Sequence, residues 1–256
     1  MRRPSSLYPE ILFHFTSIEA LFGILHTTFS VSYAREKIQG KKGVREFGVP
    51  MISFCDLRLS ELKEHMSKYG EYGIGLNKEW ANRNGLNPVW YVSKSCDFAD
   101  NFSDALDEIY RHLDTLSEPG QHKKLSDSYM KVIDTYRYIK NYEGELKRAG
   151  NVTENYRFAD EREWRFVPPL TTADVLPFVP ITRIRTQKQK ADYNQKISNV
   201  KLRFRPDDIK YLIVESESDI TDLIQHLRSV KNRFSEPDID RLSSRVLTSE
   251  QIHNDV

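Results

Sequence analysis

The sequence has little cysteine and no histidine motif. Cys55 and Cys96 are the only two cysteines in 256 residues, they lie far apart, and they form no CxxC arrangement. A disulfide framework or a cysteine zinc site needs more or closer cysteines. The seven histidines show neither HExxH nor short HxH spacing. We therefore exclude a disulfide scaffold and expect no metal site.

The sequence also lacks net charge and long apolar runs. Its 38 basic and 37 acidic residues give a net charge of +1, which supplies no global field for holding a polyanion. Nucleic-acid binding is thus not indicated by net charge, and we interpret the Lys- and Arg-rich stretch 183–205 as a solvated or partner-facing surface rather than a phosphate groove. No apolar run has membrane-spanning length, and the Met-Arg-Arg start is followed by Pro and Ser instead of an apolar signal core. We expect a cytoplasmic protein without membrane contact.

What is present describes a globular chain with mixed secondary structure. Hydrophobic residues make up 39% and charged residues 29%, which fits one folded domain over residues 1–256. Apolar runs predict strands at 11–15, 49–54, 72–76, 200–204 and 210–214. Thr16 and Glu19 have capping-box spacing, so a helix should begin after the first strand and place His14 at the strand end.

Two further segments stand out in the pattern. Apolar residues at alternating spacings of three and four on both sides of Pro119-Gly120 predict a helical hairpin, inserted into the sheet domain over 98–150. The basic stretch from Arg35 to Arg45 contains two glycines and predicts a mobile loop that could act as a lid. The predicted fold class is therefore α+β, with a mixed sheet and an inserted helical hairpin.

The most informative segment is Asp-Glu-Arg-Glu-Trp-Arg-Phe-Val at 160–167. If it is a strand, alternation puts Glu161, Glu163 and Arg165 on one face. Two neighbouring acids can have pKa values pushed apart and can stabilise a sugar cation or move a proton. The alternative is an edge strand with salt-bridged, solvated side chains.

The order of several short motifs resembles the bacterial AbiGi family. These motifs are His-Phe-Thr-Ser at 14–17, Ile-Ser-Phe-Cys-Asp at 52–56, Tyr-Gly-Glu-Tyr-Gly-Ile-Gly-Leu at 69–76 and Asp-Glu-Arg-Glu-Trp-Arg-Phe at 160–166. The family is described as an antitoxin of an abortive phage-resistance system. The resemblance implies a bacterial phage-defence protein with a toxin partner.

The same order is similar to a wider set of bacterial proteins related to the ADP-ribosyltransferase fold, in which a split β-sheet binds NAD. This resemblance implies that Glu163 is the catalytic acid and Glu161 the preceding member of a Glu-x-Glu pair. It further implies three NAD contacts, which are His14 on the ribose, Ser53 at the nicotinamide pocket, and Tyr72 or Tyr69 stacked on nicotinamide. By residue type, Arg162 or Arg165 could bind the pyrophosphate, although alternation turns Arg162 away from the acids, and Arg35 is a looser candidate for the same role.

Two function classes follow from these resemblances. In the first, the protein is an NAD-dependent ADP-ribosyltransferase in which a carboxylate stabilises an oxocarbenium-like ion, as in glycosidases. In the second, it keeps that fold without activity and acts by binding, as an antitoxin or a sensor. The intact Glu-x-Glu pair favours the first, whereas the middle motif Ile-Ser-Phe-Cys, which departs from Ser-Thr-Ser, favours the second. Glycoside hydrolysis is less fitting, because glycosidase acids come from different strands across a cleft.

Overall fold

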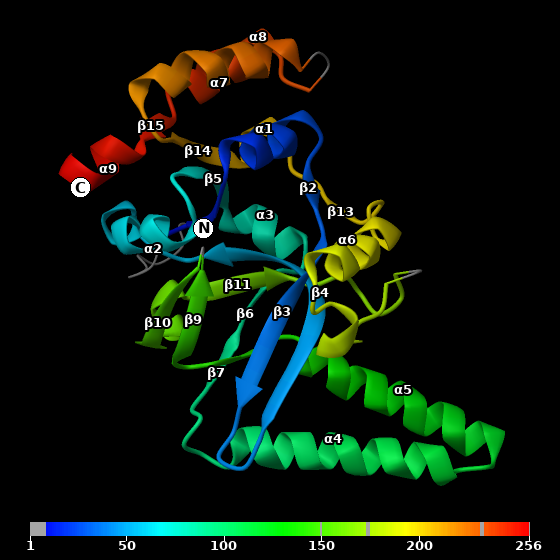
Figure 1. Ribbon diagram of the computed structural model, residues 1–256. Helices are drawn as coiled ribbons and strands as arrows, with labels where there is room; N and C mark the ends of the chain where they lie inside the picture. Colours follow the sequence, from blue (N-terminus) through cyan, green and yellow to red (C-terminus); the bar gives the residue numbers. More distant parts are fainter. Residues whose placement is uncertain (1–8, 149, 173–174, 231–232, 256) are drawn as a thin grey trace, which may run out of the picture.

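The computed structural model describes residues 9–148, 150–172, 175–230 and 233–255, which form a mixed α and β fold (Figure 1). In this part of the chain, a nine-stranded sheet has the order β15-β14-β5-β1-β4-β11-β6, and β3 and β12 also pair with β4. Its strands are β1 (Ile11–Thr16), β3 (Ser32–Gln39), β4 (Val44–Cys55), β5 (Tyr72–Asn77), β6 (Asn87–Pro88), β11 (Glu163–Phe166), β12 (Val179–Pro180), β14 (Ile209–Val214) and β15 (Val246–Thr248).

Three two-stranded sheets surround the central one. They pair β9 (Gly144–Arg148) with β10 (Asn151–Tyr156), β2 (Phe29–Ser30) with β13 (Lys201–Leu202), and β7 (Trp90–Val92) with β8 (Ile139–Asn141). The helices are α1 (Ile18–His26), α2 (Leu62–Tyr69), α3 (Lys78–Arg83), α4 (Phe98–Thr115), α5 (Pro119–Tyr136), α6 (Gln187–Lys196), α7 (Glu217–Ser229), α8 (Glu236–Ser243) and α9 (Ser249–Asp255). Short 3-10 helices include η1 (Leu59–Glu61), η2 (Phe158–Glu161), η3 (Ile181–Arg183) and η4 (Pro206–Asp208).

The two faces of the central sheet bury different clusters. On one face, Leu12, Phe54 and Ile74 join a main core that α1, α3, α7 and α8 cover. On the other face, Phe13 and Cys55 belong to a smaller cluster with residues of α2 and α9. Neighbouring residues of β1 and β4 therefore point to opposite sides, as alternation requires.

A third cluster joins the β3–β4 ribbon to the α4–α5 helical hairpin. Phe47 of β4 lies 5.2 Å, between ring centroids, from Tyr136 of α5 and 4.4 Å from Phe178. Figure 1 shows the two helices extending sideways below the ribbon, away from α7 and α8. Each large apolar side chain buried here contributes roughly 1.5–3 kcal/mol by its removal from water. The hairpin is thus fixed to the rest of the molecule at its inner end.

Strands β1 and β4 meet at one registered position. β1 pairs with β5 through six residue pairs, but with β4 only where Phe13 lies opposite Cys55. Next to this pair, Nδ1 of His14 lies 2.8 Å from the carbonyl oxygen of Ser53. A side chain therefore satisfies a carbonyl that no longer has a ladder partner on β1.

Most predicted elements are confirmed, with two changes. The first helix has Ser17, and not Thr16, as its N-cap, because the Ser17 hydroxyl accepts from the Ala20 N–H. The helical hairpin ends at Tyr136, so the predicted range 98–150 also includes two strands, β8 and β9.

The predicted lid is wrong. Its first residues belong to β3, which pairs with β4 from Ser32 to Gln39 in continuous register. The tip of this ribbon is fixed to α4, since Asp100 accepts hydrogen bonds from the backbone N–H groups of Lys41 and Lys42. Gly40 fits there because an added Cβ would lie 2.3 Å from the Asp100 carboxylate.

No helix in the described ranges has both the length and the apolar character to span a bilayer.

Candidate functional site

Glu163 is the centre of a buried network of charged groups. It is the first residue of β11 and only 4% of its surface is exposed. Its Oε1 accepts hydrogen bonds from Oγ of Ser53 and Nε of Arg165, both at 2.7 Å. Its Oε2 accepts from Nζ of Lys140 at 2.7 Å and from Nη2 of Arg165 at 3.3 Å. Four donors therefore occupy the carboxylate, about as many as its lone pairs can accept.

Two cations keep this carboxylate ionised. Burial raises the pKa of Glu163, but the charges of Arg165 and Lys140 and their hydrogen bonds outweigh burial and hold the pKa well below its usual range. Burial lowers the pKa of Lys140, but the charges of Glu163 and then Glu161 raise it well above its ordinary value. Arg165 also pairs with Glu36 of β3 at 3.1 Å and donates to the carbonyl of Arg137. The network thus holds three carboxylates and two cations.

Glu161 belongs to the same network, but it does not lie on the predicted strand. It lies in η2, and Arg162 after it is left-handed with φ of 44°, so the strand begins only at Glu163. The prediction that both acids lie on one strand is therefore wrong. Their carboxylates still converge, because Nζ of Lys140 lies 3.1 Å from Oε2 of Glu161 and 2.7 Å from Oε2 of Glu163.

Tyr69 is an aromatic residue that contacts Glu161. Its hydroxyl donates to Oε1 of Glu161 at 2.5 Å. Burial, and then the charge of Glu161, raises the pKa of Tyr69. The guanidinium of Arg148 lies over its ring, 4.5 Å from the centroid, and the imidazole of His65 stacks on it at 4.4 Å. Of the two tyrosines predicted for nicotinamide, this is the one that contacts the acid pair.

His14 lies on the opposite face of the sheet from Glu163. Its ring packs against Phe29 and Phe54 of the main core, with centroids 5.3 and 5.5 Å away. Glu163 pairs in register with Cys55, on the other face. Because a carbonyl only accepts, the contact with Ser53 puts the proton of the neutral ring on Nδ1. Burial lowers the pKa of His14.

Ser53 connects these two residues across the sheet. Its backbone carbonyl accepts from His14, and its hydroxyl donates to Glu163. The structure therefore brings together three of the residues predicted for the site, on two sides of one strand.

Tyr72 and Arg35, which were predicted to contact NAD, do not contact the acids. The Tyr72 hydroxyl donates to Glu215 and Asp219 at 3.1 and 3.2 Å, and its ring packs on the main core. Arg35 donates from Nε and Nη2 to the carbonyls of Ile184 and Arg185 at 2.9 and 2.7 Å. On β3 it alternates with Glu36, which is the residue that faces Arg165.

Sequence reasoning missed three members of the network. Lys140 and Glu36 supply charge, and the Tyr91 hydroxyl accepts the backbone N–H of Glu163 at 2.8 Å. The three come from β8, β3 and β7, which are distant from Glu163 along the chain. No spacing pattern marks them, because only strand order makes them neighbours.

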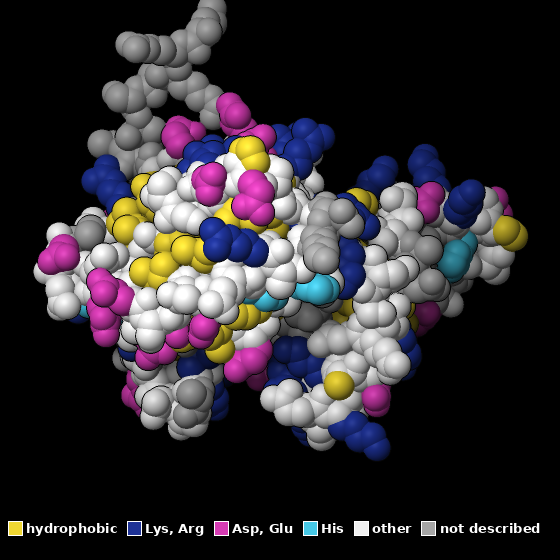
Figure 2. All heavy atoms as spheres, turned by 90° about the horizontal axis from the view of Figure 1, so that it is seen from above, with side chains coloured by type: hydrophobic (Ala, Val, Ile, Leu, Met, Phe, Trp, Pro, Cys, Tyr) yellow, Lys and Arg dark blue, Asp and Glu magenta, His cyan; other side chains and the backbone are white. Residues whose placement is uncertain are grey.

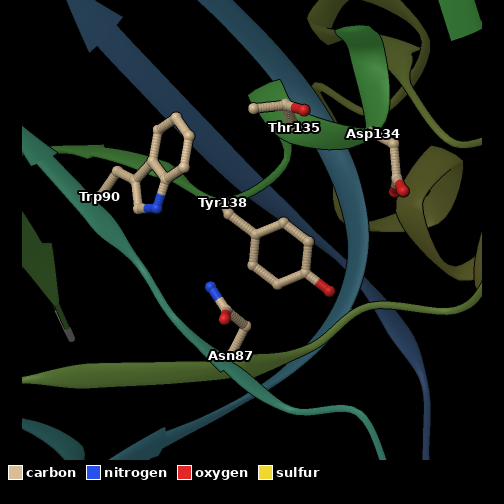
Figure 3. Close-up of a pocket in the computed structure, with 5 residues that line it drawn as sticks. All are labelled: Asn87, Trp90, Asp134, Thr135 and Tyr138. Carbon is tan, nitrogen blue, oxygen red and sulfur yellow. The ribbon is translucent and has the colours of Figure 1, made fainter. Parts of the chain in front are cut away.

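A small pocket opens near this network. Asn87, Trp90, Asp134, Thr135 and Tyr138 line it, and Figure 3 shows the Tyr138 ring between Trp90, Asn87 and Thr135. Asp134 binds the buried side chain of Arg137, whose carbonyl accepts from Arg165. Arg137 therefore connects the pocket to the acid network, but Glu163 does not line the pocket. Within the described ranges no group of three or more His, Cys, Asp or Glu side chains could hold a metal ion.

Comparison with known proteins decides the family. A family model described as "Putative abortive phage resistance protein AbiGi, antitoxin" matches residues 27–215. This chain belongs to the AbiGi family. A curated relative, "Abortive phage resistance protein AbiGi" of Lactococcus lactis subsp. cremoris, is 26% identical over 232 residues, covering 83% of this chain and 90% of the relative. No solved structure matches, so the ADP-ribosyltransferase-like type of fold stays a prediction.

Membership in the AbiGi family supports a role in phage defence. The matched range begins after α1 and includes Ser53, Tyr69, Lys140, Glu161 and Glu163, so the buried network lies within the part of the chain that the family model covers. His14 lies before it.

Proposed function

We propose that this AbiGi-family protein acts in phage defence as an antitoxin, by binding a toxin partner and not by cleaving NAD. The occupied carboxylate of Glu163 carries this proposal. An acid that stabilises an oxocarbenium ion must present an oxygen to the sugar. Both oxygens of Glu163 are instead held by Ser53, Arg165 and Lys140 in a site with 4% exposure. The family description as an antitoxin supports the same reading.

In this proposal the network has a structural role. Arg165 links β11 to β3 through Glu36 and to the end of α5 through the Arg137 carbonyl. Lys140 links β8 to β11 and to η2. The acids thus fix the position of the α4–α5 hairpin and of the β9–β10 hairpin relative to the sheet. A binding protein needs this kind of rigid scaffold.

A growth assay tests the proposal. Cells that express the toxin of the same defence system are supplied with the wild-type chain, with Glu163→Gln, or with Glu145→Gln as a control at an exposed position. We expect all three chains to restore growth in proportion to the amount of folded protein, and a tagged chain to retain the toxin. Loss of rescue by a Glu163→Gln chain present at wild-type soluble level would refute the non-catalytic role.

The second candidate is an NAD-dependent ADP-ribosyltransferase, and the position of Ser53 favours it. This residue contacts both His14 and Glu163, which the resemblance assigns to ribose and to catalysis. Tyr69 lies on the preceding acid, where the resemblance asks for an aromatic ring. For activity, Lys140 or Arg165 would have to release one oxygen of Glu163 when the sugar enters.

Calorimetric titration with NAD separates the two candidates. Under the antitoxin proposal, the folded wild-type chain gives no binding heat at millimolar NAD. Saturable binding that disappears in His14→Ala, in a variant shown to be folded, would instead support the transferase.

A further inference from the structure

Positive charge is concentrated in one segment of this nearly neutral chain. Residues 183–205 contain eight Lys or Arg residues and one acidic residue, so this segment carries +7. The rest of the chain, with 30 basic and 36 acidic residues, carries −6. Net charge therefore conceals a strong local field.

The fold adds cations from two other elements to this segment. Arg35 of β3 is attached to it through the carbonyls of Ile184 and Arg185. Burial, and then the charges of Arg35 and of Arg148 at the end of β9, lower the pKa of Lys190 of α6. α6 faces the viewer in Figure 1, and on the corresponding lower edge of Figure 2 dark-blue Lys and Arg side chains lie in a hollow that has magenta Asp or Glu side chains at its rim. Three elements thus contribute to one basic surface.

We name this the α6 basic surface and define it by six residues, Arg35, Arg148, Arg183, Arg185, Lys188 and Lys190. Across the described ranges no carboxylate forms a salt bridge with any of them. Five of the six are exposed and Lys190 is part-buried, so packing does not account for most of them. Unpaired like charges repel and destabilise the fold, and a bound polyanion would relieve that repulsion.

We propose that the α6 basic surface binds the phosphate backbone of a nucleic acid. This proposal reverses our interpretation of the sequence, which treated 183–205 as a solvated or partner-facing surface rather than a phosphate groove; the absence of carboxylate partners is the reason for the change. A protein interface needs aromatic or apolar residues at its centre, and a membrane-bound helix needs an apolar face. Residues 183–205 include none of the large exposed hydrophobic side chains of the described chain. Nucleic-acid interfaces, by contrast, are polar and strongly basic.

The span of the surface favours a polymer over a single phosphate. Its residues come from β3, β9, η3 and α6, and Arg203 and Arg205 continue the basic segment beyond α6. Several phosphates in a row would each meet a cation, and each contact would release condensed counterions. The proposal goes beyond the antitoxin role and does not depend on toxin binding.

Fluorescence anisotropy tests the proposal with labelled single-stranded and duplex oligonucleotides of about 20 nucleotides at several salt concentrations. The test variant is Arg185→Gln/Lys188→Gln/Lys190→Gln, which leaves Arg35 and its backbone contacts in place. The matched control is Lys123→Gln/Lys124→Gln/Lys131→Gln, which removes three exposed lysines from α5.

We expect the wild-type chain and the control to bind the oligonucleotides with micromolar dissociation constants at low salt. The logarithm of the association constant should fall linearly with the logarithm of the salt concentration. The test variant should bind at least about tenfold more weakly and, for duplex DNA, reduce the salt slope by about 2–3. Three results would overturn the proposal. They are no binding by the wild-type chain up to about 100 μM at 50 mM salt, equal loss in both triple variants, or binding to vesicles of anionic phospholipid without binding to oligonucleotides.

Discussion

At Glu163, two cations and a hydroxyl compensate for the loss of water around a buried carboxylate. Such arrangements add little net stability compared with an apolar core, but removal of one member is costly because the others remain buried with unmatched charge. The residue is therefore sensitive to substitution even when it has no catalytic role. Sequence reasoning placed Glu163 and Ser53 in one site.

We now expect Glu163→Gln to lower the free energy of unfolding by about 2 kcal/mol. This is less than the roughly 3–5 kcal/mol lost when a buried ion pair is fully broken, because Lys140 keeps its ion pair with Glu161 and Arg165 keeps its ion pair with Glu36. Urea unfolding followed by circular dichroism measures the change. Glu145→Gln, at an exposed position where Glu145 pairs with Lys147, is the control and should leave the free energy of unfolding almost unchanged. Equal stability of both variants would contradict the structural role.

His65 predicts how stability depends on pH. Burial lowers its pKa to about 4, with the charge of Glu161 acting in the opposite direction. The unfolded chain, with an ordinary pKa near 6.5, then binds more protons than the folded chain between pH 4 and 6.5. Folding is therefore destabilised as the pH falls through this range, by up to about 3 kcal/mol from this residue. His65→Leu should show a smaller loss than the wild-type chain when urea unfolding is compared at pH 7.5 and pH 5. Parallel losses in the two proteins would show that other groups cause the effect.

The depressed pKa of Glu163 affects stability at lower pH than His65 does. Its folded-state pKa lies below the unfolded value of about 4.3, so its stabilisation is complete above that value and is lost as the pH falls further. The two residues are separated in pH, and the His65→Leu comparison above pH 5 isolates the histidine.

At the scale of elements, the β3–β4 ribbon was predicted to be a mobile basic loop, but the structure shows a fixed pair of strands. Local sequence contains the glycines and cations of the ribbon, but its partner Asp100 is on α4, some 60 residues later. That contact helps to fix the tip. Capping motifs, by contrast, are local, and the helix after β1 was predicted to within one residue of its N-cap.

Substitution of Asp100 by Ala should loosen this tip. Two backbone N–H groups, of Lys41 and Lys42, lose a charged acceptor, which we expect to cost about 1–3 kcal/mol. Hydrogen exchange should become faster at the ribbon tip and at the start of α4, while α7 keeps its protection. Asp104→Ala, at an exposed position of the same helix, is the control. Unchanged exchange at the tip in Asp100→Ala would contradict this role of the carboxylate.

At the scale of the whole molecule, apolar residues gather in separate clusters on either side of one sheet and under the α4–α5 hairpin. The sequence predicted the mixed composition and the helical hairpin, because these follow from periodicity. It could not predict that β1 lies between β4 and β5, or that β8 brings Lys140 to Glu163, because strand order depends on contacts between distant segments.

Separate clusters predict separable unfolding. Leu106 of α4 and Leu223 of α7 are both fully buried, in different clusters. Each Leu→Ala change should cost about 2–5 kcal/mol. We expect Leu106→Ala to speed hydrogen exchange mainly in α4, α5 and the β3–β4 ribbon, and Leu223→Ala mainly in α1, α7 and α8. The same exchange pattern in both variants would show that the molecule opens only as one unit.

The central sheet ends at both sides in very short strands, and this limits how the protein can associate. β6 consists of Asn87 and Pro88, and proline has no N–H with which to bond another strand. At the other side, β15 has three residues and runs directly into α9. Open strand edges recruit further strands and lead to aggregates and exchanged dimers, which short or proline-containing edges prevent. These two ends of the sheet offer little backbone for an added strand, so a partner that meets them must bind through side chains.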